Sequence, residues 1–331
     1  MAKKLSKKPA RPSKVKLHKT FKRSYREDYI RDIEVPGVMY HIFATFKIIF
    51  RNWKLFLPLL ILSVLLAVVL VGVMREETYR EFQQILNQTT ANAGFENIGN
   101  MAKAGLLLIS TITTGGLASG SDEIKAVFVV LIFLIIWLVT IFFLRQRLAG
   151  HKVKFREGLY NAMTPLISTA TVVIIALIQS IPIFLLVVGY SAAIETEFLA
   201  TPFYALVFFI FAALMILISG YLLSSTLIAL VAVAAPGLYP MKAIRAASDL
   251  MAGRRIKFIL RIIALALALV VVWVIIMLPL MVFDLWMANF EWTANVPFIP
   301  ICLLIMTCFT GIYITTYLYL YYRWTLNYDE K

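Results

Sequence analysis

The sequence predicts an all-α membrane protein, a bundle of six transmembrane helices, and two observations support this prediction. Six long stretches of the 331-residue chain carry no Asp, Glu, Lys or Arg. Each contains an apolar run whose length is close to that of a helix crossing a bilayer, about 20 residues. The Lys and Arg residues cluster between alternate stretches. With 61% hydrophobic and 15% charged residues, against roughly 25% charged in soluble domains, the chain is not a water-soluble protein.

The uncharged stretches place the spans. We expect them at residues 55–74, 126–144, 168–190, 204–233, 258–282 and 296–320. The stretch Ala104–Ser121 is also uncharged, but a seventh crossing there would move the later basic segments to the opposite side. We therefore expect it to be interfacial or re-entrant within the external loop 75–125. The tyrosines that end the last span are expected at the cytoplasmic headgroup level.

The distribution of basic residues predicts the orientation. Of the 32 Lys and Arg residues, those expected outside are Arg75, Arg80, Lys103 and Lys125. Because basic residues stay on the cytoplasmic side, both termini are expected in the cytoplasm, and we expect a multi-pass protein of a bacterial plasma membrane. The expected parts are a basic arm at 1–37, a membrane domain at 38–324 and a short tail at 325–331.

The basic arm is expected to be partly disordered, with one helical segment. Leu17, Phe21, Tyr25 and Tyr29 recur at a spacing of four among charged residues, which favours a helix lying on anionic headgroups. A nucleic-acid contact is the sharper alternative, because phosphate surfaces of either kind attract basic residues, but it is not the one we expect. A protein partner recruited by this arm stays open.

The chain repeats one layout three times. A short amphipathic stretch on the cytoplasmic side leads into a span, a loop and a returning span, which predicts three hairpins related by a parallel repeat. The first stretch is Val38–Arg51, with an expected apolar face of Val38, Ile42, Phe46 and Ile49. The third is Pro240–Ala252, with Met241, Ile244, Ala247, Leu250 and Met251 on its expected apolar face. The second, around Leu159, Ala162 and Met163, is weaker.

The third stretch carries a family resemblance. Pro236 breaks a helix, an Ala-rich amphipathic helix with Ser248 near its end follows, and Arg254-Arg255 leads into the next span. With the six-span layout, this resembles the bacterial membrane domain fused to some glycerophosphodiester phosphodiesterases, and related families of uncharacterised integral membrane proteins. The resemblance covers about Val38 to Trp324. The chain has no phosphodiesterase domain, so that activity is not implied.

The sequence lacks the residues of several membrane enzymes and ion-coupled transporters. The histidines fall outside the expected spans, with no metal-ligand spacing, and no acid lies deep in a span. We therefore expect no enzyme, cofactor or metal. The intramembrane polar candidates are Gln179, Ser219, Ser224, Ser225 and Thr310. They either pack helices together or line a cavity for an apolar or zwitterionic ligand.

Basic residues next to the spans form a second candidate site for lipid headgroups. They are Arg145, Arg147, Lys152, Lys154, Lys242, Arg245, Arg254, Arg255, Lys257 and Arg261. The cytoplasmic orientation of these segments is enough by itself to explain their basic residues. The more specific interpretation is that the basic residues form a binding site for anionic lipid. Three functions follow as hypotheses: a lipid-binding protein of envelope organisation or of a membrane assembly, an uncoupled transporter or flippase-like carrier, and a tether acting through the arm.

Overall fold

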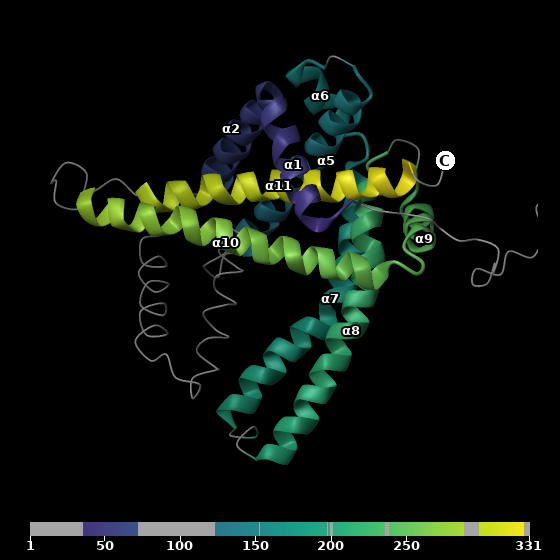
Figure 1. Ribbon diagram of the computed structural model, residues 1–331, viewed down its shortest axis with the longest axis vertical. Coiled ribbons are helices and arrows are strands. Elements are labelled where there is room, and N and C mark those ends of the chain that lie inside the picture. The colour runs from purple at the N-terminus through teal and green to yellow at the C-terminus, as the bar shows by residue number, and fades with distance from the viewer. Residues whose placement is uncertain are drawn as a thin grey trace, which may run out of the picture. The chain divides into compact units, whose positions relative to one another are not determined.

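The computed structural model describes residues 36–71, 123–151, 153–196, 198, 201–235, 238–287 and 298–327, and these residues contain no strand (Figure 1). The arm before residue 36, most of the external loop, Lys152 and the end of the tail lie outside these ranges. The helices are α1 (Val38–Arg51), α2 (Trp53–Leu70), α5 (Glu123–Leu148), α6 (Phe155–Ala162), α7 (Leu166–Glu195), α8 (Pro202–Ala232), α9 (Pro240–Leu250), α10 (Arg255–Met287) and α11 (Phe298–Asn327).

Six of the described helices are long and apolar enough to cross a membrane, which confirms the six predicted spans and defines a multi-pass membrane protein. The spans are Trp53–Leu70, Val127–Leu148, Leu166–Tyr190, Pro202–Ala232, Arg255–Met277 and Ile301–Leu326. The last span continues past its predicted end at residue 320. Its tyrosines were expected at the headgroup boundary, and that depth stays a prediction; Tyr317, Tyr319 and Tyr321 are buried by neighbouring helices.

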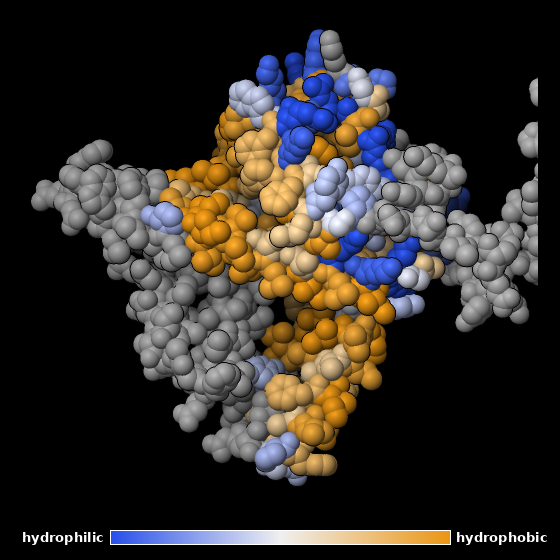
Figure 2. Space-filling model, viewed as in Figure 1, coloured by the Kyte–Doolittle hydropathy of each residue, from blue (hydrophilic) through white to orange (hydrophobic). Residues whose placement is uncertain are grey.

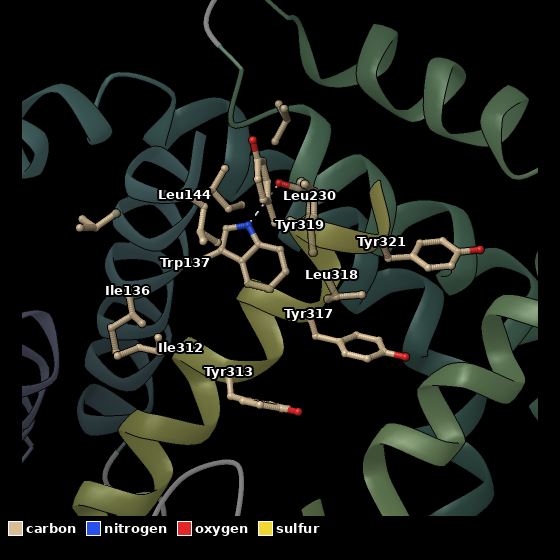
Figure 3. Packing of buried hydrophobic residues seen from close by; sticks show 14 of the residues in the cluster. Ile136, Trp137, Leu144, Leu230, Ile312, Tyr313, Tyr317, Leu318, Tyr319 and Tyr321 are labelled. Atoms are coloured by element: carbon tan, nitrogen blue, oxygen red, sulfur yellow. Dashed lines mark hydrogen bonds between the residues drawn. The ribbon is translucent and has the colours of Figure 1, made fainter. Parts of the chain in front are cut away.

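Helices α5 and α11 form the centre of the packing. Buried residues make up 56% of the most apolar stretch of each, against 6% in α7 and 11% in α8 and α10. Figure 3 shows Trp137 of α5 packed beside Tyr319 of α11, with its indole Nε1 donating to the Leu230 carbonyl oxygen of α8 over 3.2 Å. Such a bond satisfies the polar edge of a buried indole, so Trp137 joins three helices at the core.

Helices α7 and α8 pack on each other, and the second half of α8 is buried and also contacts α9, α10 and α11, whereas the most apolar stretches of both helices are largely exposed. They run side by side in Figure 1, and apolar residues cover their visible face in Figure 2. Hydrophilic residues gather instead near α6 and α9 in the same view. For a helix pair that crosses a bilayer, this exposed apolar surface faces lipid rather than water.

The short helices α1, α6 and α9 begin at or near the predicted positions, directly before α2, α7 and α10. The side of the first helix that contacts the protein is not simply its apolar face. Its buried residues are His41, Thr45 and Ile49, whereas Phe46 of the predicted apolar face is 46% exposed. The predicted apolar face is thus divided, with Ile49 packed on the protein and Phe46 at the surface.

Candidate functional site

Four helix ends that carry basic residues meet in one region, which we call the basic end. Nε of Arg147, in the last turn of α5, donates over 2.8 Å to Oδ1 of Asn52, the residue between α1 and α2. Nη2 of Arg323 in α11 donates over 3.5 Å to the carbonyl oxygen of the last residue of α5. The rings of Phe258 in α10 and Tyr321 in α11 have centroids 4.9 Å apart. The basic end therefore comprises the starts of α2 and α10 and the ends of α5 and α11.

The predicted headgroup ligands divide by exposure. Those with exposed side chains are Arg147, Lys154, Lys242, Arg245 and Lys257. Those that are half-buried are Arg145, Arg254, Arg255 and Arg261, and Lys152 lies outside the described residues. Exposed cations beside a span can reach headgroup phosphates, although Arg147 also donates to Asn52, and the half-buried Arg255 and Arg261 contact aromatic rings of the protein.

Arg255 joins three helices. Its guanidinium carbon lies 3.8 Å from the centroid of the Tyr221 ring in α8, a cation–π contact. Nη2 donates to Oγ of Ser248 in α9 over 2.9 Å, and Nη1 donates to the Tyr221 carbonyl oxygen over 3.3 Å. Between Ser248 and Arg255, Gly253 turns the chain with a φ of 75°, a value that favours glycine. The contacts of Arg255 therefore hold the α9–α10 turn against α8.

A buried aromatic cluster lies where α1 contacts α11. The His41 and Tyr317 rings stack with centroids 3.8 Å apart, and Trp324 lies 4.5 Å from the imidazole. Nε2 of His41 hydrogen bonds to the Tyr317 carbonyl oxygen over 3.1 Å, and the Tyr313 hydroxyl donates to the Ile42 carbonyl oxygen over 2.9 Å. Figure 3 shows Tyr313, Tyr317 and Tyr321 projecting from one side of α11, the side that receives α1.

The electrostatics of this cluster keep His41 neutral. Burial first, and then the positive charge of Arg261, together lower the pKa of His41 from 6.5 to about 3. Because a carbonyl oxygen only accepts, the neutral ring carries its proton on Nε2. Nδ1 of His41 and the Tyr317 hydroxyl are buried and find no hydrogen-bond partner within the described ranges. The cluster thus combines a buried acceptor and a buried donor.

Arg261 lies beside this cluster. Its guanidinium carbon is 5.6 Å from the centroid of the Tyr321 ring, within cation–π range. From the sequence, Arg261 was predicted to be a headgroup ligand and no role was assigned to His41, because no histidine has metal-ligand spacing. One sequence feature pointed to this aromatic cluster. Tyr313, Tyr317 and Tyr321 recur every four residues, which places them on one face of a helix.

The intramembrane polar candidates mostly bond to helix backbones and to each other. Oγ of Ser219 donates to the Gln179 carbonyl oxygen over 2.6 Å, and Oγ1 of Thr226 donates to the Gln179 side-chain oxygen over 2.5 Å. Two turns of α8 are thereby fastened to one residue of α7. Ser224 and Ser225 donate to carbonyl oxygens of their own helix. The bonds of Gln179 join α7 to α8, and those of Ser224 and Ser225 stay within α8, so helix packing and a ligand cavity both stay predictions.

Thr310 makes a separate contact in α11. Its hydroxyl accepts from Nε1 of Trp273 in α10 over 3.0 Å and donates to the Met306 carbonyl oxygen over 2.8 Å. Both residues are buried, so this bond pairs the polar edge of the Trp273 indole inside an apolar contact. Thr310 therefore belongs to the contact between α10 and α11, whereas the bonds of Gln179 join α7 and α8.

Within the described ranges, no group of three or more His, Cys, Asp and Glu side chains is placed to hold a metal ion. Comparison with protein families, with curated proteins and with solved structures finds no match to this chain. The resemblance to the six-span domain of glycerophosphodiester phosphodiesterases therefore stays a prediction.

Proposed function

We propose that this is a non-enzymatic integral membrane protein that binds anionic lipid headgroups through its basic end and the adjoining short helices. One observation supports this most directly: Lys154, Lys242, Arg245 and Lys257 expose their side chains on or next to α6, α9 and the start of α10. Each Lys or Arg near an anionic surface contributes about 1 kcal/mol of attraction. Its role would be envelope organisation, or that of a membrane component of an assembly.

The proposal includes an orientation. The basic end faces the cytoplasm of a bacterium, both termini lie on that side, and the protein resides in the plasma membrane. The charge distribution supports this, because the described acids next to the spans on the basic side are Glu157 and Asp249, among many more Lys and Arg residues. The proposal also includes three hairpins related by a repeat, supported by short helices directly before α2, α7 and α10.

The test measures lipid retention by the full chain. A variant with Lys242→Ala, Arg245→Ala and Lys257→Ala is compared with wild type for binding to vesicles of phosphatidylglycerol and of phosphatidylcholine, and for lipid retention in native mass spectrometry. We expect each substitution to weaken phosphatidylglycerol binding roughly fivefold, the equivalent of about 1 kcal/mol, and to leave phosphatidylcholine binding unchanged.

The matched control is Met241→Ala, which removes an exposed but uncharged side chain from the same helix. It is expected to leave phosphatidylglycerol binding as in wild type. Equal retention of the two lipids by wild type, or an unchanged preference in the triple variant, contradicts the proposal. A carrier for a lipid or apolar solute is the rival, and the bonds that Gln179 makes with Ser219 and Thr226 do not favour it.

A further inference from the structure

Helix α1 buries two polar residues and exposes several of its large apolar ones. His41 and Thr45 are fully buried together with Ile49, and Thr45 donates to the His41 carbonyl oxygen over 2.8 Å. On the opposite side, Met39 and Phe43 are each 68% exposed and Phe50 is 56% exposed. A helix lying in water has the reverse arrangement, with its apolar residues packed and its polar residues outside.

Such an inverted helix is stable only where the surrounding medium is apolar. In a bilayer, polar groups turn toward protein and find their partners there, and apolar side chains face the lipid at no cost. The Nε2 of His41 and the hydroxyl of Thr45 follow this rule, since both bond inside the protein. The burial pattern therefore places the outer side of α1 in lipid rather than in water.

The exposed apolar residues of α1 lead into those of a membrane span, across a break in the helix at Asn52. We call the combined set the outer stripe, and its residues recur every three or four positions: Met39, Phe43, Phe46, Phe50, Trp53, Leu57, Ile61 and Leu65. The last four belong to α2, one of the six candidate spans, whose outward face lipid covers. Because α1 adjoins this lipid-covered face directly, its own exposed apolar residues lie close to the same lipid.

Charged side chains limit the depth of α1. Lys47, Arg51 and Lys54 are exposed beside the outer stripe. Their long side chains keep the cationic heads in water or among phosphates while the stems lie along apolar surface. Aromatic residues at the same level, such as Trp53 and Phe50, are typical of the membrane interface.

We propose that α1 is inserted into the bilayer at the boundary of headgroups and acyl chains, with the outer stripe in contact with phospholipid acyl chains. The sequence predicts this helix as an amphipathic stretch on the cytoplasmic side, and the inference assigns its depth in the membrane. The contact is apolar, so it does not depend on lipid charge and goes beyond the headgroup binding proposed above.

Spin labelling tests this placement. Single-cysteine variants Phe43→Cys, Phe46→Cys and Phe50→Cys are made in the full chain with Cys302→Ala and Cys308→Ala, labelled with a nitroxide and reconstituted into phosphatidylcholine vesicles. Collision rates with oxygen, which partitions into lipid, and with a water-soluble nickel chelate are then compared. Lys47→Cys, exposed on the charged flank of the same helix, is the matched control.

We expect oxygen collisions to exceed nickel collisions severalfold at positions 43, 46 and 50, with a clearly lower ratio at position 47. Predominant nickel collisions at the three stripe positions would place α1 in water and overturn the inference. Low collision rates with both reagents would mean that protein, from a second copy or a partner, covers the stripe, and this also overturns it. The three stripe variants are independent, so misfolding of one leaves the comparison intact.

Discussion

The imidazole of His41 lies flat on the ring of Tyr317, 3.8 Å between centroids, and bonds through Nε2 to the carbonyl oxygen of the same residue. The two residues are 276 positions apart, so this contact fastens the first described helix to the last. Ring stacking and the backbone bond act together, which makes His41 the residue that holds α1 in place. Several measurable consequences follow from this contact and from the others described above.

His41→Ala is expected to destabilise the protein by about 3 kcal/mol. The substitution removes a fully buried ring and the hydrogen bond to Tyr317, and it leaves a cavity between α1 and α11. Thermal unfolding in detergent measures the effect as a lower Tm. Met39→Ala on the same helix is the control and should leave Tm close to wild type, since Met39 is 68% exposed. Equal losses in the two variants would contradict this role of His41.

We expect the free energy of unfolding to fall as the pH decreases from 6.5 to about 3, because of His41. Burial and the charge of Arg261 lower the pKa of His41 from 6.5 to about 3. The unfolded chain therefore binds an additional proton in this interval, so the free energy of unfolding rises with pH between these values and the contribution is complete above 6.5. The slope is at most about 1.4 kcal/mol per pH unit.

The measurement is Tm at several pH values for wild type and His41→Gln. The glutamine does not titrate, so its variant should show a flatter dependence over the interval. His151→Gln is the control, because His151 is an exposed residue outside the cluster, and it should keep the wild-type profile. A wild-type slope that persists in His41→Gln would assign the dependence to other groups.

Gln179→Leu is expected to cost only about 0.5–1 kcal/mol, the usual range for hydrogen bonds between membrane helices. Thr226 loses its bond to the Gln179 side chain but keeps its bond to the Leu222 carbonyl oxygen. Thr226→Val should cost a similar amount, and the double variant should cost less than the sum. A strictly additive double variant, measured by thermal unfolding, would show that the two side chains do not act as a pair.

Arg255→Ala is expected to destabilise the protein by roughly 1–3 kcal/mol, because it removes the contact with Tyr221 and the bond to Ser248. Ser248→Ala should cost less, about 1 kcal/mol, since it removes one bond. Lys257→Ala is the control, with an exposed side chain and no expected change in Tm. If Arg255→Ala and Lys257→Ala unfold alike, Arg255 does not hold the α9–α10 turn.

Gly158→Ala is expected to destabilise the protein by about 1–3 kcal/mol through overpacking. A β-carbon at Gly158 of α6 would overlap the Phe143 ring of α5. At Gly311 of α11, a β-carbon meets nothing within 4 Å, so Gly311→Ala should be neutral or stabilising by up to about 1 kcal/mol. Thermal unfolding compares the two. Phe143→Leu should partly rescue Gly158→Ala, and a failure to do so would locate the strain elsewhere.

The spans could be predicted from the sequence because a single physical requirement governs them. An uncharged apolar run that crosses hydrocarbon is visible residue by residue, and all six runs are spanning-length helices in the structure. The short helices were predictable for a similar reason, since Pro240 and Gly253 mark local backbone geometry.

The contacts of His41 and Arg255 could not be predicted in this way. Each depends on a partner from another helix, and the 276 positions between His41 and Tyr317 leave no local pattern to read. The buried side of α1 could not be predicted either, because His41 and Thr45 are buried there while the apolar Phe46 is exposed. Apolar residues mark the buried side of a helix in water, but not of a helix surrounded by lipid.

The pairing of His41 with Tyr317 bears on how the chain is made. A ribosome adds about 5–20 residues per second, so roughly 15–55 seconds separate the synthesis of the two rings. During that interval α1 has emerged without its partner helix, and its imidazole and threonine hydroxyl lack their final surroundings. The packing of α1 on α11 is therefore completed only when α11 enters the membrane. Until then, an insertase has time to act at α1.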